Sequence, residues 1–301
     1  MKQNIYAVVV TYNRLSLLKR AINYLQSQTL PLCGIVVVNN GSTDGTREWL
    51  DQQQGLTIVH QNNVGGSGGF YTGMKTAYEL GADWLWCMDD DVWPTEDCLA
   101  TLSSYTQQNP EIGIICPSRL MNGKFYYCEV LKFNLVNPFD HVNKKIITQE
   151  NVGKQELIPI VGMVFEGPLI SRRVVDKIGL PNKDMFILYD DSDYSYRATL
   201  FGFKVMLCLN AVLNKEYFPK KADISRERTD WKGYYMTRNM SYFCMQYGKN
   251  YFFRYLGALP SCLRAIYTVL TDNKNGKRKA VAKYLRAFID GKRKKLGKMK
   301  Q

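Results

Sequence analysis

The sequence predicts an α/β protein with a mostly parallel, doubly wound central sheet, followed by a helical and basic C-terminal region. Apolar segments with the length of buried strands cover residues 4–10, 34–38, 57–60 and 84–88. Helical patterns or helix start signals separate these segments, and short connections between alternating strands and helices favour parallel pairing. Positive charge is concentrated after residue 270, which sets the last part of the chain apart from the rest.

The first three helices each have a local signal. Residues 15–26 carry apolar side chains at helical spacing, and this pattern stops before Pro31. A second helix should begin near Ser42 or Asp44, because both residue types cap helix N-termini. A third helix is expected over residues 71–80, directly after a glycine-rich segment.

Later segments continue as mixed structure. Strand and helix patterns occur at residues 112–116 (strand), 124–136 (strand or hairpin), 171–178 (helix), from a second acidic cluster to Leu200 (helix) and 204–212 (strand). We therefore expect an α/β domain over residues 1–220 and a helical region over residues 221–301.

Composition limits the class of protein. With 301 residues, 46% of them hydrophobic, the chain can bury one large core, or one core with an appendage. The eight cysteines are scattered without a Cys-x-x-Cys pair, and we interpret them as reduced thiols of a cytoplasmic protein, without disulfides or a zinc site. The first apolar stretch is too short for a signal peptide, and no segment is long and uncharged enough to span a membrane.

The C-terminal tail carries most of the net charge of +13. Residues 271–301 hold 12 Lys and Arg against 2 Asp and Glu, whereas the first 270 residues hold 28 against 25. The nearly neutral body argues against a nucleic-acid-binding face. In the tail, apolar side chains fall near one helical face, at Val281, Leu285, Phe288 and Ile289.

Such a basic amphipathic helix is typical of segments that lie on an anionic membrane surface. The aromatic and apolar stretch over residues 251–270 would lie at the same interface. The alternatives are a solvated polar face, or a basic arm that binds nucleic acid.

Polar or glycine-rich segments follow each of the first four strands, at residues 11–14, 39–44, 62–69 and 89–91. In a parallel sheet these segments meet at the carboxyl ends of the strands, where open α/β sheets bind their ligands. The sequence therefore predicts a nucleotide site at this edge. Its expected contacts are Thr11, Tyr12, Asn13, Arg14, Asn39, Asp44, Asn62, Gly65, Gly66, Gly68 and Asp90.

Three consecutive carboxylates, Asp89, Asp90 and Asp91, end the fourth strand. Adjacent carboxylates repel one another, and the usual compensation is a hard divalent cation, Mn²⁺ or Mg²⁺, shared with a phosphate. The alternative for such a triplet is a solvated acidic turn. We expect the cation because of the strand in front and the polar segments that join the triplet at the sheet edge.

The glycine-rich segment lacks the Gly-Lys-Ser/Thr ending of a P-loop and the spacing of a dinucleotide fingerprint. Its glycines would let the backbone approach a ligand, and the alternative is a flexible connector. Asn39 and Asp44 have side chains that can bind a base or a ribose, although a capped turn would also explain them.

A second acidic cluster, Asp190, Asp191 and Asp193, follows an apolar run. Neighbouring carboxylates raise one another's pKa, which suits a general base that takes a proton from an alcohol. The alternative is capping of a helix N-terminus, for which one acid is enough. We therefore favour catalysis.

Several of these segments together resemble family 2 glycosyltransferases with the GT-A fold. The resemblance covers residues 4 to about 245 and rests on three segments, Val8–Arg14, Val36–Thr46 and Asp89–Asp91. Within the family, bacterial galactofuranosyltransferases and rhamnosyltransferases are most similar in Asn62–Phe70, Phe186–Arg197 and Tyr234–Asn239.

The resemblance implies an inverting transfer from a nucleoside-diphosphate sugar to an acceptor hydroxyl. It places the nucleoside at Thr11, Asn39 and Asp44, and Mn²⁺ or Mg²⁺ at Asp89 and Asp91 on the diphosphate. It makes Asp191 the general base, with Asp190 and Asp193 orienting sugar or acceptor.

This chain departs from the family pattern at two positions. Asn39 stands where relatives usually have an aspartate that contacts the base. Asn214 stands where relatives often have a metal-binding histidine, and neither His60 nor His141 is an obvious substitute. The metal shell implied by the resemblance is therefore incomplete in this sequence.

We expect a cytoplasmic, membrane-associated, metal-dependent glycosyltransferase that builds a surface polysaccharide on a lipid-linked saccharide. UDP-galactofuranose is the first expected donor and dTDP-rhamnose the second. The rival from another class is a non-catalytic nucleotide- or membrane-binding adaptor with the same fold. A nucleotidyltransferase is a more distant alternative, because the second acidic cluster lies far from the first in the sequence.

Overall fold

The computed structural model describes residues 3–148, 152, 155–218, 226–271 and 276–299. It contains a ten-stranded sheet with the main order β10-β12-β6-β11-β4-β1-β2-β3. In that order the strands are Leu157–Pro159, Lys204–Lys215, Ile112–Met121, Leu169–Ser171, Trp84–Asp89, Ile5–Thr11, Gly34–Asn39 and Leu56–His60, with β5 (Val92–Pro94) beside β12 and β7 (Lys124–Phe125) beside β6.

The half of the sheet that holds β4, β1, β2 and β3 is parallel, as is the β6–β12 pair. The short strand β11 joins the two halves by pairing antiparallel with both β4 and β6. These findings confirm the predicted α/β architecture with a mostly parallel sheet.

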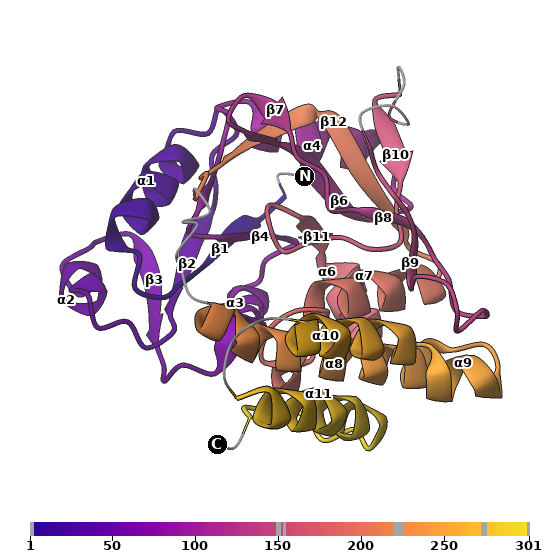
Figure 1. The fold of residues 1–301 in the computed structure, drawn as a ribbon. Coiled ribbons are helices and arrows are strands. Elements are labelled where there is room, and N and C mark those ends of the chain that lie inside the picture. Colours follow the sequence, from indigo (N-terminus) through magenta and orange to yellow (C-terminus); the bar gives the residue numbers. More distant parts are fainter. Residues whose placement is uncertain (1–2, 149–151, 153–154, 219–225, 272–275, 300–301) are drawn as a thin grey trace.

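Helices cover both faces of the sheet (Figure 1). Alternate residues of β1 point to opposite faces, so that Val8 and Val10 enter one hydrophobic cluster and Ala7 and Val9 the other. The first face packs against α3 (Gly65–Glu79), α6 (Arg172–Ile178) and α7 (Asp190–Leu200). The second packs against α1 (Leu15–Gln26), α2 (Thr46–Leu50) and α4 (Cys98–Gln108).

Most predicted elements are confirmed, with two informative differences. The helix after Asn39 begins at Thr46, two residues beyond Asp44, and its N-cap residue is Gly45. Helix α3 begins at Gly65, six residues before the predicted start at Tyr71. The glycine-rich segment is therefore mainly the first turns of a helix, and the prediction that it precedes the helix is wrong.

The glycines of α3 bring this helix close to the sheet. A Cβ atom on Gly69 would lie 2.5 Å from Val10 Cγ1, and one on Gly73 would lie 2.4 Å from Val8 Cγ1. Both contacts are far shorter than real Cβ contacts. The close packing against β1 thus requires glycine at these two positions, despite its low helix propensity.

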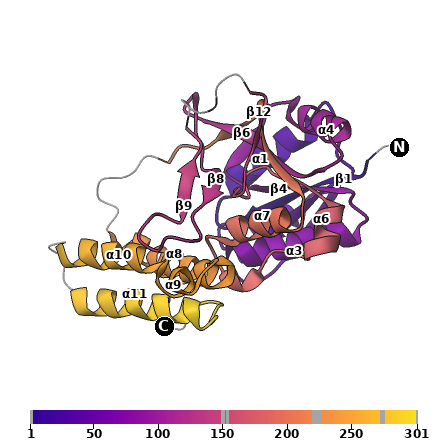
Figure 2. The ribbon, with the colours of Figure 1, turned by 90° about the vertical axis from the view of Figure 1, so that its right-hand side faces the viewer.

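The C-terminal helices form a layer beneath α3, α6 and α7 in Figure 1, and Figure 2 shows them together outside the sheet. They are α8 (Arg226–Tyr247), α9 (Tyr251–Leu256), α10 (Leu259–Thr271) and α11 (Lys277–Lys292). The predicted boundary between residues 220 and 221 lies outside the described residues.

This helical layer shares a hydrophobic core with the body of the protein. Phe243 and Phe253 of the layer are fully buried in one cluster with Phe133 of β8 (Val130–Phe133), which pairs with β9 (Asn143–Ile146), and with Met185. The predicted helical region is thus present, and it packs on the preceding residues through this common core.

Helix α11 is the basic helix that the tail pattern predicted. Its Ala287 and Gly291 are buried against the layer, and Phe288 packs into the shared core, whereas Leu285 and Ile289 are 46% and 44% exposed. Among the residues that the structure describes, no helix combines the length and the apolar character needed to cross a bilayer.

Candidate active site

The carboxyl ends of four parallel strands lie at one level. The register pairs Thr11 of β1 with Asn39 of β2, and Asn39 with His60 of β3, while Val10 pairs with Asp89 of β4. The polar segments that follow these strands therefore meet at one edge, as the sequence predicted. This edge is where an open parallel sheet binds its ligand.

The triplet at the end of β4 is held by residues from the end of β1. The Thr11 hydroxyl donates to Asp90 Oδ2 at 2.7 Å. Arg14 Nη1 lies 3.1 Å from Asp90 Oδ1 and 3.0 Å from Asp91 Oδ2, so one guanidinium bridges two of the three carboxylates. Asp90 and Asp91 are both buried.

A second cation reaches the triplet from β12. Lys215 Nζ lies 3.3 Å from Asp91 Oδ1 and 2.7 Å from Glu166 Oε1. The other oxygen of Glu166 forms an ion pair with Arg119 Nε at 3.1 Å, and Arg119 Nη2 lies 2.7 Å from Glu129. Arg119 and Glu129 are almost completely buried, so this chain of charges runs from the sheet edge into the interior.

The network carries an excess of negative charge. In their ionised forms, five carboxylates (Asp89, Asp90, Asp91, Glu129 and Glu166) face three cationic side chains (Arg14, Arg119 and Lys215). Burial, and then repulsion by Asp91, Glu166 and Asp90, raises the pKa of Asp89 well above its usual range. In the described part of the chain, no ion pair or hydrogen bond from another side chain reaches the Asp89 carboxylate.

The residue that faces the triplet from the last strand is Lys215, next to the Asn214 position singled out from the sequence. Asn214 lies on β12 beside Lys215 and pairs with Trp93 of β5. Because neighbouring side chains of a strand point to opposite faces, Asn214 and Lys215 point to different sides of the sheet. Among the described residues, no cluster of three or more His, Cys, Asp and Glu side chains has the geometry of a complete metal site.

Asn13, Asn39 and Asp44 hold the two turns at the ends of β1 and β2 together. Asn13 Oδ1 accepts from the Thr43 amide at 2.7 Å, and Asn39 Oδ1 accepts from the Ser42 amide at 2.9 Å. Asp44 accepts from the Leu15 amide at 3.0 Å. Although burial opposes it, hydrogen bonds from Thr46 and Leu15 hold the pKa of Asp44 below its ordinary value. Asp44 is therefore ionised at neutral pH.

The predicted nucleotide contacts differ in how accessible they are. Tyr12 is 46% exposed and Asn62 is exposed, whereas Asn39 is buried with its amide 3.1 Å from His60 Nδ1. A Cβ atom on Gly66 would meet nothing within 4 Å, whereas one on Gly65 would collide with the Phe186 carbonyl and one on Gly68 with Val64. Of the three glycines, only Gly66 borders open space.

The second acidic cluster forms the first turn of α7, as predicted. Burial raises the pKa of Asp190 to about 6. Burial and the nearby Asp190 carboxylate raise the pKa of Asp191 to about 8. Asp191 as a whole residue is half-buried, and its carboxylate has a proton affinity suited to exchange near neutral pH.

Asp193 has different surroundings from its two neighbours. Arg197 Nε donates to its Oδ2 at 2.9 Å, and the Tyr247 hydroxyl donates to its Oδ1 at 2.6 Å. The side chain is almost fully buried. Asp193 therefore joins α7 to α8, and both of its oxygens are occupied by protein groups.

The family assignment comes from comparison with known proteins. Residues 6–179 match the model of glycosyl transferase family 2. The galactofuranosyltransferase GlfT1 of Mycolicibacterium smegmatis is 30% identical over 215 residues, which are 68% of this chain and 68% of that protein. The chain belongs to glycosyltransferase family 2.

Further relatives agree with this assignment. The dTDP-rhamnosyl transferase RfbF of Shigella flexneri is 27% identical over 210 residues, covering 68% of this chain and 66% of RfbF. The crystal structure of GalNAc-T7 with UDP, GalNAc and Mn²⁺ is similar over 96% of this chain and 56% of that one, with a TM-score of 0.63 and 13% identity. The fold is thus GT-A, and the protein is a glycosyltransferase, as the sequence predicted.

Sequence reasoning missed several residues of this candidate site. Glu166 and Lys215 complete the charge network at the triplet, and Asn40 ties β2 to α3 through the Gly65 carbonyl at 3.0 Å. Lys215 ends the last strand, and the rule that strand ends carry the site would have found it. Arg119 and Glu129 gave no signal in the sequence, because nothing in it shows that these two charged side chains are buried and pair with each other.

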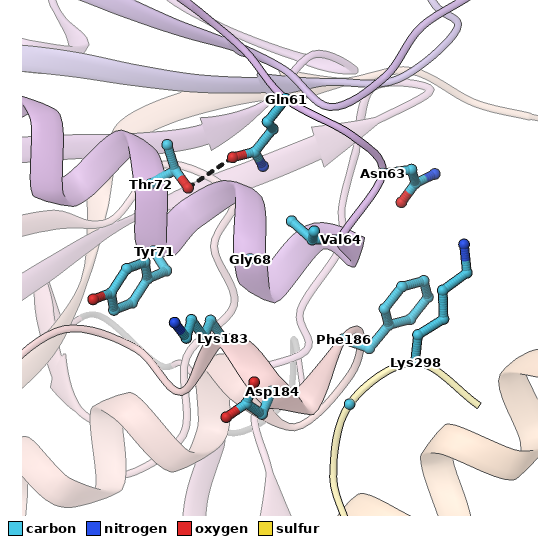
Figure 3. A pocket seen from close by; sticks show the side chains of 11 residues that line it. Gln61, Asn63, Val64, Gly68, Tyr71, Thr72, Lys183, Asp184, Phe186 and Lys298 are labelled. Atoms are coloured by element: carbon cyan, nitrogen blue, oxygen red, sulfur yellow. Dashed lines mark hydrogen bonds between the residues drawn. The ribbon is translucent and has the colours of Figure 1, made fainter. Parts of the chain in front are cut away.

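A pocket of about 400 Å³ lies beside the start of α3 (Figure 3). Val64, Tyr71, Lys183, Phe186 and Lys298 line it, among others. None of the six carboxylates of the two acidic clusters lines this pocket. Gly68, one of the predicted nucleotide contacts, does line it, so the pocket adjoins the glycine-rich part of the predicted nucleotide site.

Proposed function

We propose that this glycosyltransferase inverts the anomeric centre of a nucleoside-diphosphate sugar, and that the sugar is galactofuranose carried by UDP. The acceptor in this proposal is a hydroxyl of a lipid-linked saccharide, at the cytoplasmic face of a membrane where surface polysaccharide is made. The similarity to GlfT1 supports the choice of sugar. The observation that carries the mechanism is a contrast in ion pairing. The triplet is tied to Arg14 and Lys215, whereas none of the described cationic side chains pairs with Asp191, a separate carboxylate whose pKa is also raised.

Asp191 acts as the general base in this proposal. Its carboxylate takes the proton of the acceptor hydroxyl, and the oxygen forms a bond to the anomeric carbon. The bond from that carbon to the diphosphate breaks on the opposite side, and the diphosphate leaves with the electron pair. Because the new bond forms opposite the broken one, the anomeric configuration inverts.

Asp89 and Asp91 would hold Mn²⁺ or Mg²⁺. The fit rests on the oxygen-only donor set and on the two uncompensated negative charges of the network, which equal the charge of one such cation. The bound cation would neutralise charge that develops on the departing diphosphate. Thr11, Asn39, Asp44 and the half-exposed Arg14 are proposed to lie beside the nucleotide.

The donor can be identified by a hydrolysis and transfer screen on the full chain with Mn²⁺. The candidates are UDP-galactofuranose and dTDP-rhamnose, the second because RfbF is also a relative. We expect UDP release above background with UDP-galactofuranose, and a loss of this activity on chelation. Turnover of dTDP-rhamnose alone would identify dTDP-rhamnose, and not UDP-galactofuranose, as the donor. Turnover of neither nucleotide sugar would contradict the proposal.

We also propose that the helical layer rests on an anionic membrane. Exposed apolar side chains recur on three of its helices, at Tyr251 and Phe252 of α9, Leu263, Tyr267 and Leu270 of α10, and Leu285 and Ile289 of α11. The exposed Arg286 lies between the last two in the sequence, and the exposed Arg293 follows directly after α11. Apolar insertion together with attraction to anionic headgroups is how such surfaces bind membranes.

Vesicles that contain phosphatidylglycerol test this part of the proposal. Leu285→Glu with Ile289→Glu should reduce co-sedimentation by roughly tenfold, because two inserted side chains are replaced by charges that the lipid repels. Leu200→Glu on α7, where the side chain is 58% exposed, is the matched control and should leave binding unchanged. Equal loss in both variants, or equal binding to neutral vesicles, would exclude this surface.

A further inference from the structure

The loop before α7 has an unusual backbone. Phe186, Leu188 and Tyr189 have φ angles of 66°, 68° and 68°, in the left-handed region that side chains with a Cβ atom rarely adopt. Such a conformation persists only where the surrounding structure holds it. We name residues 184–189 the base loop, because Asp190 and Asp191 follow it directly. The backbone of the base loop sets the direction of both carboxylates.

Asn239 of α8 contacts the base loop through its side-chain amide. Its Nδ2 donates to the carbonyl oxygens of Met185 at 3.0 Å, Ile187 at 2.9 Å and Leu188 at 2.7 Å. The side chain has no exposed surface. One buried amide group therefore fixes three carbonyls around the residues of positive φ.

Arg238 supports the same loop and orients Asn239. Its Nη2 donates to the Met185 carbonyl at 2.7 Å, and its Nε donates to Asn239 Oδ1 at 2.9 Å. Its Nη1 donates to the carbonyl of Gly297, whose own amide donates to the Asp184 carbonyl. The guanidinium thus connects the base loop, α8 and the segment after α11, which a single-point cation such as lysine cannot do.

Helix α3 contacts the base loop as well. The Ser67 amide donates to the Phe186 carbonyl at 3.2 Å, and a Cβ atom on Gly65 would lie 2.0 Å from that same oxygen. The Phe186 ring stacks on Tyr235 of α8, with ring centres 4.8 Å apart. Figure 3 shows Phe186 between the start of α3 and the segment that carries Lys298.

We propose that Arg238 and Asn239 are positioning residues, which hold the base loop so that Asp190 and Asp191 face the acceptor hydroxyl. The inference rests on the proposed role of Asp191 as general base. Neither residue is assigned a contact with donor or acceptor. Their effect on transfer is instead exerted through the backbone that leads into α7.

Asn239→Ala in the full chain tests the proposal. We expect kcat to fall roughly a hundredfold, because misplacement of a base by about 1 Å has an effect of this size, while the donor KM changes less than about twofold. A looser loop also admits water to Asp191. The acid limb of kcat should therefore move to lower pH, by roughly one unit, although the carboxylates of Asp190 and Glu166 still face Asp191.

Ser241→Ala is the matched control. Ser241 is buried on the same helix, and its hydroxyl donates to the Phe288 carbonyl of α11 at 2.9 Å, away from the base loop. This variant should lose some thermal stability and keep the kcat and pH profile of the parent. If Asn239→Ala does not fold, Asn239→Leu keeps a similar size and shape, loses the amide donors without adding a charge, and carries the same expectation.

The outcomes separate this inference from the proposed function. A folded Asn239 variant with parental kcat and pH profile overturns the positioning role, as does an equal kcat loss in Ser241→Ala. Asp191→Asn is measured in parallel. If that variant still transfers sugar, the proposed general base is wrong; if it is inactive while Asn239→Ala is fully active, only the positioning role fails.

Discussion

The two acidic clusters of this glycosyltransferase contain three aspartates each, and they differ in their ion pairs. At Asp89–Asp91, Arg14 and Lys215 neutralise part of the charge and a threonine hydroxyl donates to Asp90. At Asp190 and Asp191, none of the described cationic side chains forms an ion pair, and burial raises both pKa values. Only Asp193 has a cationic partner, Arg197.

The difference indicates what each cluster can do. The ion pairs with Arg14 and Lys215 fix the positions of Asp90 and Asp91, which suits the binding of a cation and a diphosphate. A carboxylate without such partners exchanges its proton near neutral pH, which suits general base catalysis. A run of aspartates is thus informative only together with the cations around it.

The largest expected effect is on kcat, and it distinguishes the role of the second cluster from that of the triplet. Asp191→Asn removes the proton acceptor and leaves the shape unchanged, so kcat should fall about a thousandfold with little change in donor KM. Steady-state transfer assays at saturating donor measure this. Comparable kcat in a folded Asp191→Asn variant would show that the second cluster is not the base.

A smaller effect is expected at the triplet. Asp91→Asn leaves the ammonium of Lys215 and the guanidinium of Arg14 with one fewer carboxylate and removes a proposed cation ligand. The concentration of Mn²⁺ needed for half-maximal activity should rise on the order of tenfold to a hundredfold, by the size of effect seen when ligand shells are altered. The activity of the parent and of Asp91→Asn is titrated with Mn²⁺. Asp44→Asn, a variant outside the charge network, is titrated for comparison.

The smallest effect concerns stability and its pH dependence. The pKa of Asp191 is about 8 in the folded protein and about 4 in unfolded chains, so folding takes up a proton between these values. The stability contributed by this group is present below pH 4 and lost as the pH rises to 8. Asp191→Asn should therefore unfold at a higher temperature at pH 8, by on the order of 1 kcal/mol in free energy.

Thermal unfolding of parent and Asp191→Asn at pH 5 and pH 8 checks the sign. The advantage of the variant should grow between these pH values. An equal advantage at both, or a less stable variant at pH 8, would mean that the carboxylate is better solvated than its surroundings indicate.

The sheet edge and α7 were predictable because their signals are local. Strand β1 and helix α1 follow apolar patterns that a short window contains, and helix α7 begins at its own acidic cluster. Parallel topology then brings Thr11, Asn39 and Asp89 to one level without further information. The family pattern added roles for these positions, which periodicity alone does not give.

The parts of the fold and the site that the sequence did not predict depend on contacts between residues that are distant in the sequence. Lys215 meets Asp91 across 124 positions, and Arg238 meets the Met185 carbonyl across 53. The start of α3 was misplaced for the same reason. Glycine has a low helix propensity, so four glycines in five residues predict a loop, but the close approach of Phe186 and β1 to this helix makes glycine necessary there.

The contacts of the base loop also bear on the order in which the parts of the site can form during synthesis. Strands β1 to β4 and the triplet lie within the first 91 residues, so their half of the sheet is available early in synthesis from the N-terminus. The base loop is held by Arg238 and Asn239. Through Arg238 it is also joined to Gly297, which lies more than 100 residues after the loop in the sequence. A chain interrupted before α8 would retain strands β1 to β4, which carry the proposed donor site, and would lack the groups that orient its proposed base.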